Sequence, residues 1–169
     1  MLTGSNTGDR TSILWEALEQ LNRVVGPVKK VSALYESDAW GYHSVNRYLN
    51  QAVFLETPLS PMELLETTQQ IEKLLGRETK SSGQQYEDRP IDIDILFYDN
   101  EIINRPNLTI PHPAMISRRF VMEPLCEISS DFRHPVFGKS IKELKSECID
   151  FSQVEKFSEK TIDKGRFEV

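Results

Sequence analysis

The stretch from Asp88 to Asn100, DRPIDIDILFYDN, constrains the fold more than any other part of this sequence. Side chains alternate between the two faces of a strand, so the three isoleucines should point to one face and Asp92 and Asp94 to the other. Aspartate is among the poorest strand formers, so two of them in one strand need a reason beyond propensity. Two carboxylates this close also repel each other, and we expect something to neutralise them.

Two interpretations of this strand are possible. In an edge strand with a wet outer face both aspartates would simply be solvated, which is the ordinary explanation of an arbitrary D-x-D sequence. The apolar run Ile95–Tyr98 instead favours a central strand, and the segment before it carries Arg77, Lys80 and Arg89, which can bind phosphates. Mg²⁺ prefers oxygen ligands and typically takes one or two carboxylates plus substrate phosphates, and neighbouring carboxylates can bridge two ions. We therefore interpret the aspartate pair as a magnesium site.

Composition limits the class of protein. The chain has 169 residues, 38% of them hydrophobic and 27% charged, which predicts one soluble globular domain over residues 1–169, with a peripheral tail from about residue 149. There is no apolar run long enough to span a bilayer and no basic-then-apolar leader. The net charge of -6 argues against broad nucleic-acid binding but permits a small anionic ligand. Two cysteines are too few for a disulfide scaffold, so we expect a cytoplasmic protein. We also expect a monomer.

Hydrophobic periodicity predicts helices and strands that are mixed along the chain. The expected helices cover 9–25, a segment from the capping box Ser60-Pro61-Met62-Glu63 to Gly76, a segment around 118–128, and a capped segment from Ser140; the expected strands cover 28–37, 48–56 and 91–98. The expected strands 28–37 and 48–56 follow each other with no helix between them. This order favours an α+β sandwich, one sheet with helices on one face, over a doubly wound fold.

The motif around the two aspartates resembles the signature R-x-x-D-[LIV]-D-[LIV] of the 6-hydroxymethyl-7,8-dihydropterin pyrophosphokinase family of folate biosynthesis. Other parts of the family pattern follow in the family's order: Gly4-Ser5-Asn6, Tyr48-Leu49-Asn50, Gln69 and Glu72, Gly76-Arg77, Pro111-His112, Arg118 and Phe120. Each part is weak alone, but together they are specific and cover most of the chain. The resemblance implies transfer of the β,γ-pyrophosphoryl group of ATP to the hydroxymethyl group of the pterin. It also implies a ferredoxin-like α+β fold with one mainly antiparallel sheet, and two Mg²⁺ ions.

The resemblance also implies a role for each matching residue. Asp92 and Asp94 would be the metal ligands, and Arg77 and Arg89 would stabilise the transferred group. The pterin would bind through Ser37, Trp40, Tyr48, Asn50 and Phe120, with its ring between Tyr48 and Phe120. ATP contacts would come from Gln69, Glu72, Arg77, Lys80, Tyr86, Arg89, Ile95, Thr109, His112 and Arg118. Without the resemblance, Phe120 would be taken for a core aromatic residue and His112 for an ordinary loop histidine.

The sequence departs from the family pattern in several places. Thr79 stands where a second basic residue is usual, and Lys80 is the candidate replacement, as a point charge rather than a planar fork. Tyr86 stands where a tryptophan is common. Only Met1–Thr3 stand before the Gly-Ser-Asn motif, so we expect genuine residues of the first strand to be missing from this start. The segment 77–89 is almost free of apolar residues, and we expect it to be mobile without ligand and to close over bound ATP and pterin.

Two other functions share some of these features. Nucleotidyltransferases also combine a Gly-Ser motif with D-x-D, but their two motifs lie close together in sequence, whereas Gly4 and Asp92 are far apart. A non-enzymatic ligand-sensing module of ferredoxin-like fold would need no acid pair beside a cationic segment. Incubation with ATP, magnesium and the reduced pterin separates the three functions. AMP release indicates a pyrophosphokinase, pyrophosphate release indicates nucleotidyl transfer, and no reaction favours the ligand-sensing module.

Overall fold

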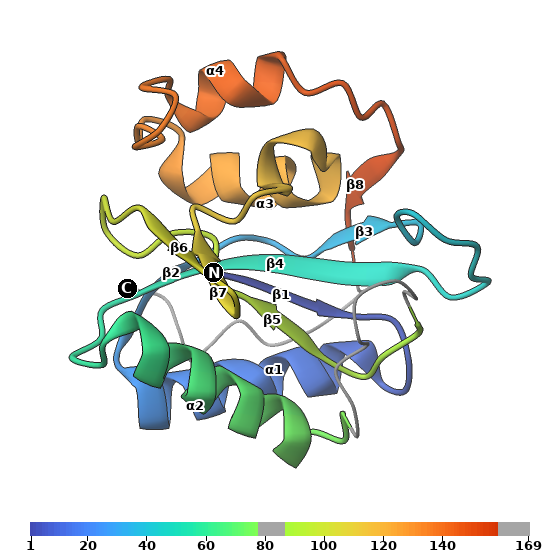
Figure 1. Ribbon diagram of the computed structural model, residues 1–169. Helices are drawn as coiled ribbons and strands as arrows, with labels where there is room; N and C mark the ends of the chain where they lie inside the picture. Colours follow the sequence, from blue (N-terminus) through green and yellow to red (C-terminus); the bar gives the residue numbers. More distant parts are fainter. Residues whose placement is uncertain (78–86, 159–169) are drawn as a thin grey trace.

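An antiparallel sheet forms the middle layer of this protein (Figure 1). The computed structural model describes residues 1–77 and 87–158, and within them the sheet has six strands. They lie in the order β5-β1-β4-β3-β8, with β2 paired to the other half of β4, and all these pairs are antiparallel. The strands are β1 (Leu2–Ser5), β2 (Val28–Val31), β3 (Tyr35–Ser37), β4 (Tyr48–Leu55), β5 (Asp92–Asp94) and β8 (Val154–Lys156).

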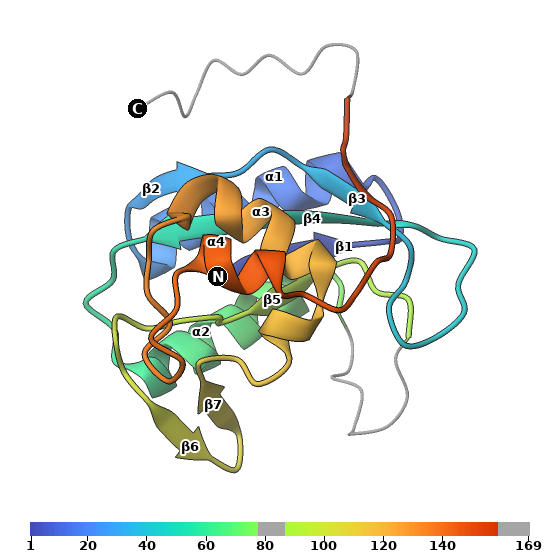
Figure 2. The same ribbon diagram turned by 90° about the horizontal axis from the view of Figure 1, so that it is seen from above.

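Helices cover both faces of the sheet (Figure 1). Helix α1 (Arg10–Gln20), continued by a π-helical segment (Leu21–Val25), and α2 (Pro61–Leu74) lie on one face. Helix α3 (Arg119–Ser129) lies across the other face, and α4 (Ile141–Ser146) packs on the outer side of α3; Figure 2 shows both from above. The prediction of helices on one face is therefore wrong. It missed that the second face is also apolar, because Leu2, Ala52 and Leu96 pack there against α3 and α4.

The order of the first elements produces the ferredoxin-like arrangement. The chain runs β1, α1, the pair β2 and β3, β4, α2 and β5, and both helices pack on the same face. A hairpin of β6 (Ile103–Arg105) and β7 (Leu108–Ile110) and a short 3₁₀ turn (Met115–Ser117) then lead to α3. The expected fold class is confirmed. No helix in residues 1–77 or 87–158 has the length and apolar character needed to cross a lipid bilayer.

Local signals placed the helix ends correctly. Ser60 Oγ accepts a hydrogen bond from Glu63 N (3.4 Å), while Glu63 Oε2 accepts one from Ser60 N (2.8 Å). The same box recurs at the start of α4, where Ser140 and Glu143 exchange bonds of 3.2 and 2.7 Å. Gly76 follows α2 with a φ of 93°, a left-handed conformation that glycine adopts without strain. Both capping boxes and the end of α2 are thus confirmed.

The prediction of one strand over 28–37 is wrong, because β2 and β3 are separate and pair with opposite halves of β4. Between them the Ser32 hydroxyl accepts a hydrogen bond from Ala52 N (3.0 Å) and donates one to Ala33 O (2.7 Å). The side chain thus takes over main-chain pairing where the strand breaks. Strand propensity along the sequence contains no sign of such a bond to a distant residue.

The strand of the two aspartates is shorter than the predicted 91–98 and is not central. Of the predicted strand, only the part that forms β5 pairs with another strand. Among the described residues its only partner is β1, so β5 lies at an edge of the sheet. The apolar run is buried by helices instead: the three isoleucines pack with α1 and α2, and Leu96 packs with α3 and α4. A short apolar run does not distinguish these two kinds of burial.

The segment after residue 149 contains a strand that its composition did not predict. β8 pairs with β3, with Lys156 opposite Tyr35 and Val154 opposite Ser37. Just after it, Phe157 N donates to Leu34 O (2.8 Å). The end of the described chain is therefore attached to the sheet along the outer side of β3.

Candidate active site

A pocket opens at one end of the sheet, on the face covered by α3. Strands β1, β3, β4 and β5, the loop after β3 and the start of α3 all contribute to it. Of the residues that the sequence assigned to the site, the pocket brings together Ser37, Trp40, Tyr48, Asn50, Arg89, Asp92, Asp94, Arg118 and Phe120. Residues far apart in sequence therefore converge at one pocket, as expected. The binding and catalytic roles assigned to them remain predictions.

The inner wall of the pocket is polar and buried. Asn50 is only 2% exposed, and its Nδ2 donates to Ser37 Oγ (3.1 Å) across β3 and β4. Gly4, on the neighbouring strand, leaves room for this side chain, because a Cβ there would lie 3.0 Å from Asn50 Oδ1. A buried amide offers both a donor and an acceptor, which suits the edge of a nitrogen heterocycle.

The outer walls are aromatic. Tyr48 begins β4, Phe120 lies in the first turn of α3, and Trp40 belongs to the loop after β3. The guanidinium of Arg118 stacks among these rings, 4.5 Å from the centre of the Trp40 ring and 6.0 Å from that of Phe120. Flat, delocalised groups are favoured between such rings, whether they are cations or heterocycles.

Asp92 and Asp94 line the pocket together, and Ile93 between them points into the core. The predicted alternation of faces is thus present. Asp92 is paired with two guanidiniums: its Oδ1 lies 2.5 Å from Arg77 Nη1, and its Oδ2 lies 3.1 Å from Arg89 Nη1. Burial lowers the pKa of Arg89, but the charge of Asp92, together with smaller contributions from Tyr48, Tyr42 and Asp94, outweighs burial and raises it. Two arginines therefore supply the opposite charge that the acid pair needs.

Arg77 lies beneath the pocket, between Asp92 and a buried carboxylate of α2. Glu72 is 2% exposed, and its Oε1 accepts hydrogen bonds from Arg77 Nη1 (2.6 Å) and from Ile93 N (2.8 Å). One carboxylate thus holds Arg77 and also satisfies a main-chain N–H on β5. Arg77 is itself 7% exposed, so this ion pair is well shielded from water.

Other residues assigned from the sequence lie outside the pocket wall. Gln69 is on α2 at the opposite face of the sheet, Ile95 is buried in the core under α1 and α2, and Thr109 is exposed on β7. His112 follows β7, and burial together with the charge of Arg118 lowers its pKa. Lys80, Tyr86 and the predicted closure of their segment lie outside the described residues.

Comparisons with known proteins identify the family of this chain. The family model of 7,8-dihydro-6-hydroxymethylpterin-pyrophosphokinase matches residues 1–130. This chain belongs to that family. The chain is 45% identical over 133 residues to the 2-amino-4-hydroxy-6-hydroxymethyldihydropteridine pyrophosphokinase of Porphyromonas gingivalis, a match that covers 78% of this chain and 90% of that protein. The family expected from the sequence is thus confirmed.

Longer proteins contain a similar segment. A folic acid synthesis protein of Pneumocystis carinii is 39% identical over 148 residues, which cover 87% of this pyrophosphokinase and 20% of that protein. The fold is similar to the crystal structure of the Plasmodium falciparum HPPK-DHPS protein, with a TM-score of 0.70 and 17% identity. That match covers 86% of this chain and 43% of the longer one.

Some pocket residues of this pyrophosphokinase were missed from the sequence. Leu2 and Tyr42 line the pocket, and Asn6 and Asp88 form hydrogen bonds at its mouth. Tyr42 lies in the loop between β3 and β4, whose aromatic content was visible in the sequence. Asp88 stands next to the signature motif, but no local pattern indicated its partners.

The carboxylates of Asp92 and Asp94 suit a hard cation that also coordinates substrate phosphates. Among the described residues no group of three or more His, Cys, Asp or Glu side chains could enclose a metal ion. Asp92 and Asp94 offer carboxylate oxygens on one face of β5, at the pocket wall. Mg²⁺ keeps several waters and commonly combines one or two carboxylates with phosphate oxygens, which matches two carboxylates at a pocket wall better than a closed cage of protein ligands.

Proposed function

We propose that this chain transfers the pyrophosphoryl group of ATP to 6-hydroxymethyl-7,8-dihydropterin with two Mg²⁺ ions held by Asp92 and Asp94. The chain is a pyrophosphokinase by its family, and the reaction belongs to folate biosynthesis. The observation that carries the metal proposal is the pair of same-face carboxylates beside two arginines at an aromatic pocket.

In this proposal the pterin binds between Tyr48 and Phe120. The amide of Asn50 and the polar groups from Ser37 to Trp40 face the edge of the ring, which needs both donors and acceptors. Stacking and edge recognition together fix the ring, so that the hydroxymethyl oxygen lies toward the carboxylate pair. Orientation of this kind converts a bimolecular reaction into an effectively unimolecular one.

The arginines act on the triphosphate. Bound Mg²⁺ would supply charge neutralisation at the phosphates, and Asp92 and Asp94 would hold it. Arg77 and Arg89 both pair with Asp92, so phosphates held there through the metal would lie beside two guanidiniums. The hydroxymethyl oxygen forms the new bond to the β-phosphorus, the bond from that phosphorus to the α,β-bridging oxygen breaks, AMP leaves, and the hydroxyl proton goes to solvent. The guanidiniums stabilise the charge that shifts during this transfer.

The remaining positions would bind the nucleotide. We propose direct contacts for Gln69, Lys80, Tyr86, Thr109, His112 and Arg118. For Glu72, which is 2% exposed, we propose an indirect role as the residue that holds Arg77, and for the buried Ile95 a role in shaping the site. We further propose that the chain acts as a monomeric, cytoplasmic, single-domain enzyme over residues 1–169.

The test is a product assay with ATP, the reduced pterin and graded Mg²⁺, followed by ³¹P NMR. AMP and the pterin diphosphate should form only with the divalent ion, and chelation should stop the reaction. Arg89→Ala should lower turnover by about a hundredfold or more while ATP affinity changes little, because its charge matters most in the transition state. Arg105→Ala, an exposed arginine on β6, is the matched control. Turnover without any divalent ion would contradict the metal proposal, and full turnover of Arg89→Ala would contradict the role of that arginine.

A further inference from the structure

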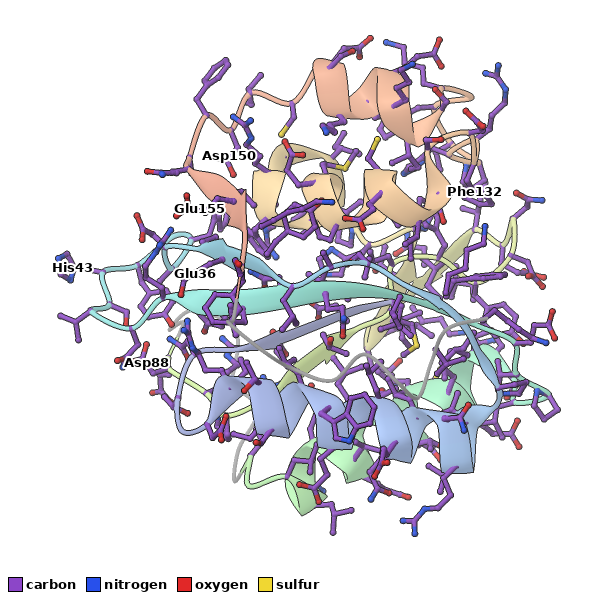
Figure 3. All side chains as sticks on the ribbon, turned by 180° about the vertical axis from the view of Figure 1, so that it is seen from behind. Glu36, His43, Asp88, Phe132, Asp150 and Glu155 are labelled. Carbon is purple, nitrogen blue, oxygen red and sulfur yellow. The ribbon has the colours of Figure 1, made fainter. Side chains whose placement is uncertain are left out.

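Asp88 joins two segments that reach the pocket from distant parts of the chain. Its Oδ1 accepts hydrogen bonds from Asn6 Nδ2 (2.7 Å) and from Tyr42 OH (2.9 Å), and its Oδ2 accepts one from Asn46 Nδ2 (2.6 Å). Figure 3 shows Asp88 at the same end of the molecule as His43, whose loop carries both Tyr42 and Asn46. The carboxylate therefore ties the chain just before β5 to the loop between β3 and β4.

The charge of Asp88 suits these partners. The hydroxyl of Ser44, and then the donors on Asn46, Asn6 and Tyr42, lower the pKa of the Asp88 carboxyl to about 2, although burial alone would raise it. At neutral pH the group is thus ionised and can only accept hydrogen bonds, which is what several converging donors require. An amide of the same shape would turn one of its donors toward another donor.

The residue after Asp88 is Arg89, and its main chain is held by Asn6. Arg89 N donates to Asn6 Oδ1 (2.7 Å), and Asn6 N donates to Arg89 O (3.2 Å). Asn6 is 3% exposed and directly follows β1, so it is a rigid support. From this support Arg89 Nη1 reaches Asp92 Oδ2 (3.1 Å). The positions of Asp88 and of the Arg89 guanidinium are therefore set together.

A second connection runs to the aromatic wall of the pocket. The hydroxyls of Tyr42 and Tyr48 lie 2.9 Å apart. Because Tyr42 donates its single proton to Asp88, Tyr48 is the donor between the two, and Tyr42 is a nearer acceptor for it than Glu87 O at 3.4 Å. Burial raises the pKa of both tyrosines, so both hydroxyls keep their protons. A continuous path of hydrogen bonds thus leads from the ring of Tyr48 to the residue next to Arg89.

We infer that Asp88 is a positioning residue for the pyrophosphoryl transfer, which holds the pterin-stacking Tyr48 and the phosphate-binding Arg89 in one hydrogen-bonded unit through Tyr42 and Asn6. The inference rests on the functions proposed above for Tyr48 and Arg89. It assigns a contribution to the reaction to Asp88 and Tyr42, two residues that the sequence did not assign to the site. Small misplacements of a catalytic group are costly, since a shift of about 1 Å can reduce turnover by about a hundredfold.

The test compares Asp88→Asn and Tyr42→Phe with matched controls. Asp9→Asn removes a charge from an exposed aspartate that also accepts from several donors, at the start of α1, and Tyr98→Phe removes a hydroxyl that donates to Leu59 O (2.7 Å) away from the pocket. For each variant, kcat and both KM values are measured, together with calorimetric Kd values for the pterin and for a non-hydrolysable ATP analogue. Active-site titration corrects kcat for any unfolded fraction.

We expect Asp88→Asn to lower kcat per active site by about tenfold or more and to weaken pterin binding, while the Kd of the ATP analogue stays within about twofold. Tyr42→Phe should act in the same direction, and the double variant should lose little beyond Asp88→Asn, because both changes break one path. The controls should stay near the wild type. Unchanged kcat per active site and unchanged pterin Kd in Asp88→Asn would overturn the inference while Arg89→Ala remained impaired. If Arg89→Ala were itself fully active, the proposed function of Arg89 would fail instead.

Discussion

Two opposing electrostatic effects act on Asp92 in the protein without metal: repulsion by Asp94 and attraction by two arginines. Two neighbouring carboxylates repel each other, so removal of one could stabilise the fold. In the structure, however, both oxygens of Asp92 are paired, one with Arg77 and one with Arg89. Arg77 is 7% exposed, and a buried guanidinium that loses a partner is costly. The pairing therefore outweighs the repulsion.

Asp92→Ala should accordingly lower the free energy of unfolding without metal, by about 1–3 kcal/mol, because two guanidiniums lose a charged acceptor. Urea unfolding followed by circular dichroism in the presence of a chelator measures this. Asp131→Ala, on an exposed aspartate, should change stability by no more than about 0.5 kcal/mol. An Asp92→Ala variant more stable than the wild type would show that repulsion within the acid pair dominates.

Phe120→Ala tests the stacking role at a single ring. The variant removes one aromatic wall of the pocket, so pterin binding should weaken by about 1–3 kcal/mol, by analogy with the stacking of bases on aromatic side chains. Binding of an ATP analogue should change much less. Calorimetric titration with each ligand decides the matter. Equal losses for both ligands would mean that Phe120 is a core residue and that the pterin does not stack there.

Two histidines should make stability depend on pH. In each, Nδ1 accepts a hydrogen bond from a main-chain N–H two residues on, at 3.3 Å for His112 and 3.2 Å for His134. Burial lowers the pKa of both imidazoles, with a further contribution from the charge of Arg118 at His112. Between these lowered values and the ordinary pKa of about 6.5, the unfolded chain binds more protons than the folded one. Their contribution is therefore complete above about pH 6.5 and is lost as the pH falls through the folded pKa values.

The free energy of unfolding, from urea titrations between pH 7.5 and 5.5, should decrease toward the acid end. His134→Gln should remove part of this slope, because glutamine can still accept the bond but does not titrate. His43→Gln is the control, since His43 is exposed and projects from its loop (Figure 3). A slope that is the same in all three proteins would refute the contribution of His134.

At the scale of elements, the break between β2 and β3 depends on one hydroxyl. Ser32 is 3% exposed, and its Oγ accepts from Ala52 N (3.0 Å) in the middle of β4. Ser32→Ala would leave that buried N–H without its acceptor and should lower the free energy of unfolding by about 1–3 kcal/mol. Ser146→Ala, which removes an exposed serine hydroxyl at the end of α4, should cost far less. Denaturant unfolding of both variants is the measurement, and equal small losses would show that water replaces the Ser32 hydroxyl.

The elements also show what the sequence could and could not predict. The capping boxes at Ser60 and Ser140 and the alternation of Asp92 and Asp94 depend on residues a few positions apart, so local patterns predicted them. The edge position of β5, the second layer of helices and β8 depend on which segments meet after folding. The Asp88 contacts are of the same kind, because Asn6 and Asp88 lie 82 positions apart in the chain. Family resemblance supplied the pocket residues, but it contained no counterpart for Tyr42 or Asp88.

At the scale of the whole molecule, β8 covers the edge of the sheet that β3 would otherwise expose. It pairs with β3 and is fastened by Lys156 Nζ to Glu127 Oε2 (3.2 Å) and by Glu155 Oε1 to Arg47 Nη1 (3.3 Å). Phe157 follows it and packs, partly buried, against the core under α1 and α2. An uncovered strand edge invites pairing with another chain, so this cover bears directly on the proposed monomeric state.

A chain that ends at residue 152 should therefore behave differently from one that ends at residue 158, and the comparison isolates β8 and Phe157. The shorter chain loses the burial of Phe157 and the pairing along β3, so its free energy of unfolding should fall by about 1–2 kcal/mol. Its exposed β3 edge should also promote association, because unpaired N–H and C=O groups of a strand can pair with those of a second copy. Sedimentation velocity over a range of concentrations should show a monomer for the chain ending at 158 and larger species for the chain ending at 152. If both chains sediment as monomers and unfold at the same urea concentration, β8 does not protect the sheet. If both associate, the proposal of a monomer is wrong whatever β8 does.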